Sequence, residues 1–379
     1  MSASRPWTAA TAGLAALTAT AGVAQELPAG RPLRGWSLSP SLSLTYGYDD
    51  NLFSDAERRR DRVARARPGL RIAWRSATVS ATARYSADAE HFAEHPTLTA
   101  ARSRDEGSLA AGFTGRRMEA WAEGSVVRTT RPNELFPETG LDLARAEVLR
   151  RAAHSYVSYR WRRRLQISLT HSSILDALVA GPREEAAAPE QATHVGRLKL
   201  EHRASPRHTL GVAYAVRYYR LADARLPLSH VLAADWTHRL DERSSVHLSA
   251  GPRLSRGVVE PEIDARLTRS SRNGSLTLAL SRTEAAVVGE PRPLRVDSAG
   301  IVLRQGLRAF ELTLAPGLFA SRGAGRPIRV YRARLEVAAQ VARWLRIAAS
   351  HDFSVQHGRS QDGIRHGVTE LRVVLGEPD

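Results

Sequence analysis

The sequence feature that most constrains the fold of this chain is an alternation of apolar and polar residues. In 36–48 every second residue is apolar or proline, and serine or threonine fills most of the places between them. Because successive side chains of a β-strand point to opposite faces of the sheet, this pattern predicts a strand with one apolar and one polar face. The pattern recurs through the rest of the chain, so an all-β fold is predicted.

We count eighteen alternating segments. Each is about as long as the ~9–11 residues that a tilted strand needs to cross a membrane, or slightly longer. Tryptophan and tyrosine lie near the ends of several segments, where the aromatic girdles of a membrane barrel are found. The segments are 36–48, 62–74, 78–87, 106–114, 117–127, 152–161, 165–172, 193–202, 208–220, 229–238, 245–255, 261–269, 275–282, 295–303, 309–320, 328–339, 344–355 and 364–375.

The connections between the segments alternate in length. Tight turns such as 75–77 and 115–116 alternate with longer or more polar links such as 88–105 and 128–151. Short turns at one end and long loops at the other are typical of a transmembrane β-barrel, and an even number of strands places both termini at the short-turn, periplasmic side. A secreted β-sandwich or solenoid also has alternating strands. Strand length, loop rhythm and the even count favour a transmembrane antiparallel up-and-down β-barrel of about 18 strands over residues 36–379.

The N-terminal residues predict export from the cytoplasm. Residues 1–24 combine one early arginine with a weakly apolar run and small residues before Gln25, which is typical of a secretory signal peptide cleaved near Ala24. Residues 25–35 are predicted to be a periplasmic linker. No later run of ~18 apolar residues predicts a membrane helix. We therefore expect the mature protein in the bacterial outer membrane, in contact with its lipid.

The composition narrows the chemistry that the chain can carry. There is no cysteine, which excludes disulfides and cysteine-based metal sites. The formal net charge is +16, and almost all the cations are arginines, a preference that codon bias can also produce. Because the chain is predicted to be exported, we expect no nucleic-acid partner in spite of this charge. No local catalytic signature selects a nucleophile or an acid–base pair, so the sequence predicts no enzyme activity, catalytic residue, metal or cofactor.

Two short polar motifs could be taken for ligand sites. His91 and His95 flank a carboxylate in a predicted loop, but the order is not that of a zinc protease. Asp49, Asp50 and Asn51 could offer oxygen ligands to Ca²⁺, yet they lack the spacing of an EF-hand loop. We expect the first motif to be a solvated loop and the second to cap its own backbone, as Asp and Asn do in turns.

Many basic residues share the polar phase of the segments, which would face the lumen of a barrel. Acidic residues share that phase, including Glu336, Asp352 and Glu370. One interpretation is a wall of cross-strand ion pairs that fixes the register. Another is a net positive lumen that attracts anionic solutes or an acidic sugar polymer. Both interpretations can be true of the same lumen wall. The basic residues predicted to line the lumen and contact a solute or polymer are Arg65, Arg67, Arg71, Arg84, Arg197, Lys199, Arg203, Arg217, Arg266, Arg332, Arg334 and Arg346.

A family resemblance rests on the first predicted hairpin. The run Tyr48-Asp49-Asp50-Asn51-Leu52-Phe53, followed by Asp61 and then Pro68-Gly69-Leu70, resembles the opening of the β-barrel porin 2 group. That resemblance implies an outer-membrane barrel associated with exopolysaccharide secretion, acting with periplasmic export components. The chain departs from the usual barrel ending because Leu375 is followed by Gly376-Glu377-Pro378-Asp379 and no terminal aromatic residue is present.

Three functions are compatible with this sequence. With the resemblance, the preferred hypothesis is a conduit for exopolysaccharide export with a basic aqueous lumen. The first alternative is a general diffusion porin that prefers anions. The second is a structural or adhesive barrel whose lumen is closed.

Overall fold

A computed structural model of the protein describes residues 35–180, 190–221, 224–225, 227–323, 327–358 and 363–376. The predicted signal peptide and almost all of the predicted linker lie outside these residues. Gly35, assigned by the sequence to the linker, is the first residue of β1.

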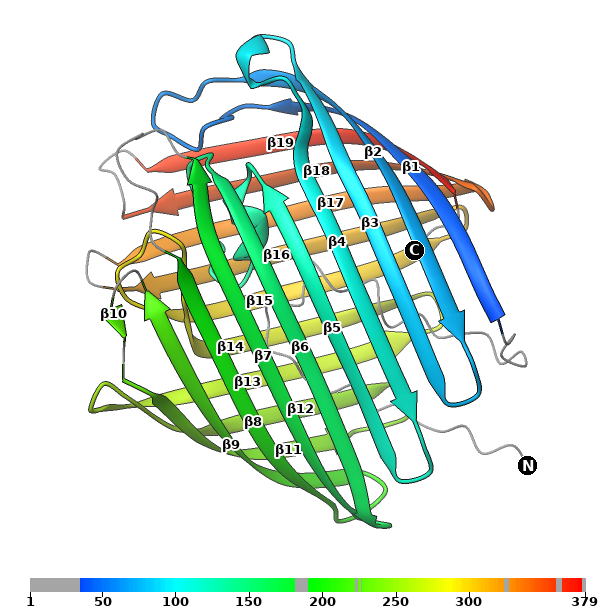
Figure 1. The fold of residues 1–379 in the computed structure, drawn as a ribbon, viewed down its shortest axis with the longest axis vertical. Coiled ribbons are helices and arrows are strands. Elements are labelled where there is room, and N and C mark those ends of the chain that lie inside the picture. Colours follow the sequence, from blue (N-terminus) through cyan, green and yellow to red (C-terminus); the bar gives the residue numbers. More distant parts are fainter. Residues whose placement is uncertain are drawn as a thin grey trace.

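Long antiparallel strands form one closed sheet (Figure 1). Each long strand pairs with the next along the chain, and the last pairs with the first. The strands are β1 (Gly35–Asp49), β2 (Asp61–Arg75), β3 (Val79–Phe92), β4 (Ala100–Thr114), β5 (Met118–Thr129), β6 (Glu147–Arg162), β7 (Leu165–Ala180), β8 (Gln191–Arg203), β9 (His208–Leu221), β10 (Ala224–Arg225), β11 (Ser229–Arg239), β12 (Ser244–Ser255), β13 (Val258–Ser271), β14 (Gly274–Ala285), β15 (Leu294–Leu307), β16 (Phe310–Arg322), β17 (Ile328–Ala342), β18 (Leu345–His357) and β19 (Ile364–Gly376).

The predicted number of strands is confirmed. β10 has only two residues and pairs with the end of β9, while β9 itself pairs with β11. Without β10, the 19 strands of the sheet leave 18 in the closed barrel. Two short 3₁₀ turns, η1 (Pro96–Leu98) and η2 (Pro132–Leu135), lie in the longer connections. The described residues contain no helix long and apolar enough to cross a membrane.

Several strands extend further toward the long-loop end than the alternation predicts. β4 begins at Ala100 where the pattern predicts 106, and β7 ends at Ala180 where it predicts 172. Charged residues interrupt the apolar alternation in these extensions. They stay in strands because they pair with one another, as Arg150 of β6 does with Asp176 of β7 at 2.7 Å.

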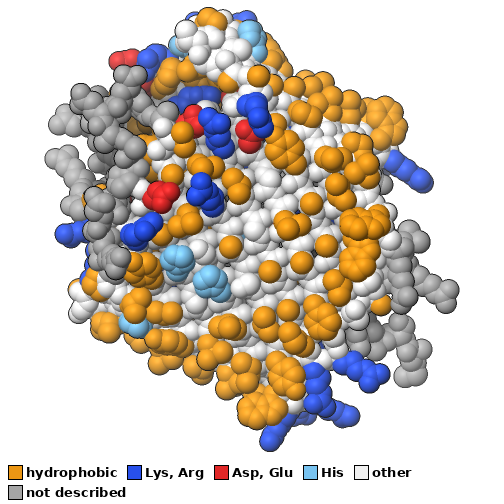
Figure 2. Space-filling model, in the orientation of Figure 1, with side chains coloured by type: hydrophobic (Ala, Val, Ile, Leu, Met, Phe, Trp, Pro, Cys, Tyr) orange, Lys and Arg blue, Asp and Glu red, His pale blue; other side chains and the backbone are white. Residues whose placement is uncertain are grey.

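The register separates an apolar outer face from a polar inner face. Leu44 and Tyr46 of β1 pair with alanines of β2 and are 43% and 58% exposed, whereas Thr45 between them pairs with Arg65. Hydrophobic side chains are spread over the outer surface in Figure 2, with charged groups gathered toward its ends. At the short-turn end Trp36 contacts Trp74, their ring centroids 6.4 Å apart, as expected of an interfacial girdle. An apolar belt around a closed antiparallel sheet is the architecture of an outer-membrane β-barrel.

The first long loop is ordered by its own polar residues, as predicted. The Asn51 backbone N–H donates to the Asp49 carboxylate at 2.9 Å, and its side-chain amide donates to the carbonyl of Asp55 at 2.8 Å. The histidine motif differs from the prediction. His91 lies in β3, and the His95 ring is 2.9 Å from the buried carboxylate of Asp61, so the motif is not simply a solvated loop.

Candidate functional site

The loop between β5 and β6, residues 130–146, lies inside the barrel, and we call it the crossing loop. In Figure 1, β2–β9 form the front wall and β11–β19 the back wall. The crossing loop leaves the front wall, and its Phe136 and Leu141, each 1% exposed, form one buried cluster with Val296 and Val330 of the back wall. The loop therefore spans the lumen at the long-loop end and narrows the passage.

The far tip of the crossing loop has a fixed shape. Gly140 has a φ of 64°, and a Cβ placed on it would lie 2.3 Å from the ring of Phe319. The Thr139 hydroxyl donates to the carbonyl of Phe136 at 2.8 Å and accepts the backbone N–H of Leu141 at 3.2 Å. Only glycine fits at the tip, because any side chain there meets both the left-handed backbone and the aromatic ring.

Asp142 attaches the crossing loop to β18 and β19. Its backbone N–H donates to Oε1 of Gln356 at 3.0 Å, and its carboxylate accepts the hydroxyl of Ser354. Nδ1 of His366 lies 3.7 Å from the same carboxylate, while Nε2 of that ring lies 3.0 Å from Asp49. Burial disfavours the charged form of Asp142, but the nearby His366 ring and the hydrogen bond from Ser354 outweigh it and lower the pKa of Asp142.

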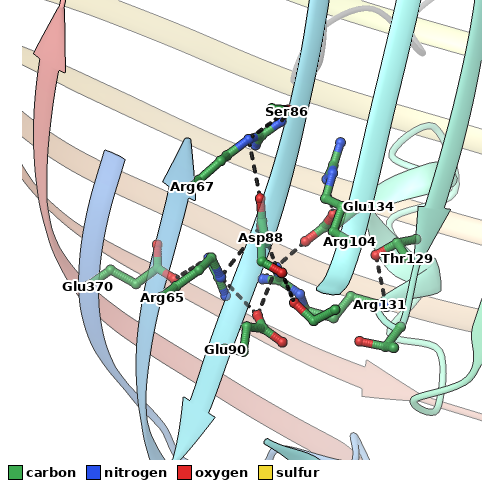
Figure 3. Close-up of polar contacts among 12 residues, drawn as sticks. Arg65, Arg67, Ser86, Asp88, Glu90, Arg104, Thr129, Arg131, Glu134 and Glu370 are labelled. Carbon is green, nitrogen blue, oxygen red and sulfur yellow. Dashed lines mark hydrogen bonds and ion pairs between the residues drawn. The ribbon is translucent and has the colours of Figure 1, made fainter. Parts of the chain in front are cut away.

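A cluster of buried ion pairs anchors the other end of the crossing loop to the front wall. In Figure 3, side chains of β2, β3, β4 and the crossing loop converge around Asp88 and Glu90. Glu90, 3% exposed, lies 2.8 Å from Arg65 of β2 and 3.1 Å from both Arg131 and Arg145 of the loop. Removing one partner from such a group leaves a charge buried without compensation.

Glu134 adds a second anchor at the same wall. Its carboxylate pairs with Arg104 of β4 and lies 3.1 Å from Arg131. Burial disfavours its ionised form, but the guanidiniums of Arg131 and Arg104 outweigh that cost and lower the pKa of Glu134. The crossing loop is thus held by charges at the front wall and by apolar contacts and hydrogen bonds at the back wall.

Most of the basic residues selected from the sequence form ion pairs along the inner wall. Examples are Arg67 with Glu106 at 2.8 Å and Arg334 with Glu336 at 2.7 Å. These pairs make the wall largely self-compensating, as the cross-strand interpretation expects. The predicted basic residues that pair with a described acidic residue are Arg65, Arg67, Arg197, Lys199, Arg217, Arg334 and Arg346.

The remaining predicted residues form no ion pair within the described part of the chain. Arg71 of β2 and Arg84 of β3 lie directly opposite each other in register. Nε of each is buried and has no acceptor among the described residues. Both lie in the half of their strands that leads to the short turn, beyond the anchored loop. Arg203, Arg266 and Arg332 are likewise without an ion pair in the described ranges, so five of the twelve predicted basic residues have no acidic partner there.

Comparisons with known proteins add similarities of fold at low identity. No family model and no curated protein matches the chain, so the resemblance to the β-barrel porin 2 group remains an expectation. Among solved structures, OccAB4 of Acinetobacter baumannii is 9% identical with a TM-score of 0.49, covering 92% of this chain and 100% of its own. OpdL of Pseudomonas aeruginosa is 13% identical with a TM-score of 0.47, covering 90% and 99%. OpdK of Pseudomonas aeruginosa, solved with vanillate, is 12% identical with a TM-score of 0.48, covering 90% and 98%. At these values none of them carries an argument about function.

The crossing loop is the part of the site that the sequence prediction missed. The alternation predicts only a longer or more polar link for 128–151, although this segment contains Leu135, Phe136, Leu141 and Leu143. A loop that stays in water has little reason to carry four large apolar residues. That apolar content was the available signal, and the structure explains it by burial against the back wall.

Proposed function

We propose that the protein is an outer-membrane diffusion channel that prefers small anionic solutes. The observation that carries the proposal is the crossing loop, which is attached to both walls of the barrel. A passage narrowed in this way suits small solutes better than a polymer. The exopolysaccharide conduit implied by the resemblance would require the loop to leave the lumen and break both attachments.

The preference for anions rests on the distribution of charge along the passage. Paired residues such as Arg334 contribute little net charge, whereas Arg71 and Arg84 present two uncompensated guanidiniums side by side. Fixed charges lining a pore set its ion selectivity. Arginine keeps its charge at any physiological pH and bonds carboxylate or phosphate oxygens with a planar fork. A solute that passes the crossing loop would therefore meet a positive wall on its way to the periplasm.

Planar-bilayer recordings of the full chain test both parts of this proposal. Addition of neutral polyethylene glycols of graded size should lower the conductance only for the small members that enter the passage. The reversal potential in a potassium chloride gradient should have the sign of chloride preference. Entry of large polymers would contradict the narrow passage, and a potassium preference would contradict the anion selectivity.

A further inference from the structure

A cavity of about 350 Å³ lies at the long-loop end of the barrel. It is bounded by the tip of the β12–β13 hairpin and by the long-loop ends of β14, β15 and β16. We call it the arginine pocket, because its charged lining consists of Arg253, Arg256, Arg292, Arg295 and Arg322 with Glu260 and Glu284.

The two glutamates of the arginine pocket are already engaged. Glu260 pairs with Arg253 and lies 2.9 Å from Arg295. Glu284 accepts the Ser255 hydroxyl at 3.2 Å and lies 3.8 Å from Arg256. Among the described residues that line the pocket, five arginines against two glutamates give a formal charge of 5 − 2 = +3. No acidic side chain of the lining is left for a further cation.

Arg292 and Arg322 carry most of this excess charge. Neither forms an ion pair or a side-chain hydrogen bond with a described residue. Arg322 of β16 lies directly opposite Arg295 of β15 in register. Like charges facing each other across a sheet destabilise it unless something lies between them.

Two buried donors in the lining also lack an acceptor. Arg253 is 1% exposed, and its Nε has no partner among the described residues. Nε of Arg295 is buried and equally without an acceptor there. Unsatisfied buried donors are rare in native structures, and a bound ligand or ion is one explanation for them. An oxyanion bound in this cavity would account for all three observations. It would neutralise the excess positive charge, separate the opposed arginines and accept hydrogen bonds from the orphan donors.

We propose that the arginine pocket binds a soluble multivalent oxyanion, of the class represented by phosphate and small phosphate-bearing molecules. Guanidinium forks bind phosphate oxygens in pairs. A lining charge of +3 favours a dianion over a monocarboxylate or chloride. This inference goes beyond the anion channel proposed above, because it adds a binding site for a multivalent anion at the long-loop end of the barrel.

Isothermal titration calorimetry tests the pocket. The full-length protein is kept in a phosphate-free detergent and inorganic phosphate is added stepwise. Wild type should show saturable binding. The variant Arg292→Gln/Arg322→Gln should bind about tenfold more weakly or worse, because each charge-assisted bond lost is equivalent to roughly that factor in affinity. Arg243→Gln/Arg272→Gln, which removes two arginines from exposed turns, should bind phosphate as wild type does, and acetate should compete poorly. Heat-modifiable gel mobility checks that each variant is folded.

Three results would overturn the proposal. Wild type could fail to bind phosphate, or the Arg292/Arg322 variant could bind it as tightly as wild type does. A third result is that wild type, but not the Arg292/Arg322 variant, retains an anionic phospholipid while neither binds inorganic phosphate. That result would place a lipid headgroup in the pocket. Reversal potentials of the same variants separate this inference from the channel proposal. A wild type that prefers chloride but does not bind phosphate refutes the pocket alone, whereas one that prefers potassium refutes the proposed function.

Discussion

The backbone N–H of Asp142 donates a 3.0 Å hydrogen bond to the side chain of Gln356, which lies 214 positions away in the sequence. This bond joins a loop that starts in the front wall to a strand of the back wall. Asp142 is 5% exposed and Gln356 1% exposed, so water does not compete freely for it. The closed register of the barrel brings the two residues together and places the crossing loop across the lumen.

Gly140→Val should displace the crossing loop and raise the single-channel conductance. The new side chain would collide with Phe319 in a left-handed backbone, and overpacking of this kind costs about 1–3 kcal/mol. Gly124→Val is the matched control, because nothing lies within 4 Å of a Cβ at that position of β5. Equal conductance in the two variants would show that the tip of the loop does not limit the passage.

Acidification should loosen the attachment of the loop to β18 and β19. The pKa of Asp142 is lowered from 3.8 in the folded protein because the nearby His366 ring and the hydrogen bond from Ser354 outweigh its burial. Its stabilising contribution is therefore complete above its ordinary pKa and is lost as the pH falls through the lowered value. Conductance should therefore stay constant while the pH is well above 3.8 and rise as the pH falls below that value.

The control for the acid effect is Asp142→Asn, which removes the titrating carboxylate. Its conductance at pH 7 should already be higher than that of wild type, and the remaining change on acidification should be smaller. Glu134, whose pKa is also lowered, acts in the same direction and accounts for a residual effect. An acid response as large in Asp142→Asn as in wild type would assign the effect to other groups.

Glu90→Gln should destabilise the barrel by about 3–5 kcal/mol, because it leaves the buried Arg145 without an acidic partner among the described residues and removes one partner each from Arg65 and Arg131. The midpoint temperature of the heat-modifiable gel shift measures this. Glu57→Gln removes a carboxylate that is 74% exposed beside Arg59, and such surface pairs contribute at most about 1 kcal/mol. A shift no larger for Glu90→Gln than for Glu57→Gln would mean that the anchor cluster contributes little.

The strands and their closure could be predicted from the sequence because alternation is a local property. The run Leu210, Val212, Tyr214 identifies the outer face of β9, and the observed strand, His208–Leu221, ends one residue beyond the predicted one. The long/short rhythm of the connections then places the loops at one end.

The candidate site was less predictable because it depends on contacts between distant residues. Arg65 meets Glu370 at 3.5 Å only after the barrel has closed through β1 and β19. That register determines which arginines have an acidic partner and which, like Arg71, have none among the described residues. The sequence of the crossing loop has no hydrophobic periodicity that would predict its position. Its apolar residues indicate burial, but the surface that buries them is known only from the folded barrel.

The measurement that tests the central claim most directly is the reversal potential of Arg71→Glu/Arg84→Glu in a potassium chloride gradient. Wild type should prefer chloride, and this variant should shift clearly toward potassium, because two uncompensated lumen arginines become carboxylates. The control Arg243→Glu/Arg272→Glu makes the same change of charge in exposed turns and should shift the potential less. An unchanged reversal potential in Arg71→Glu/Arg84→Glu, or a wild type that prefers potassium, would contradict an anion-selective channel.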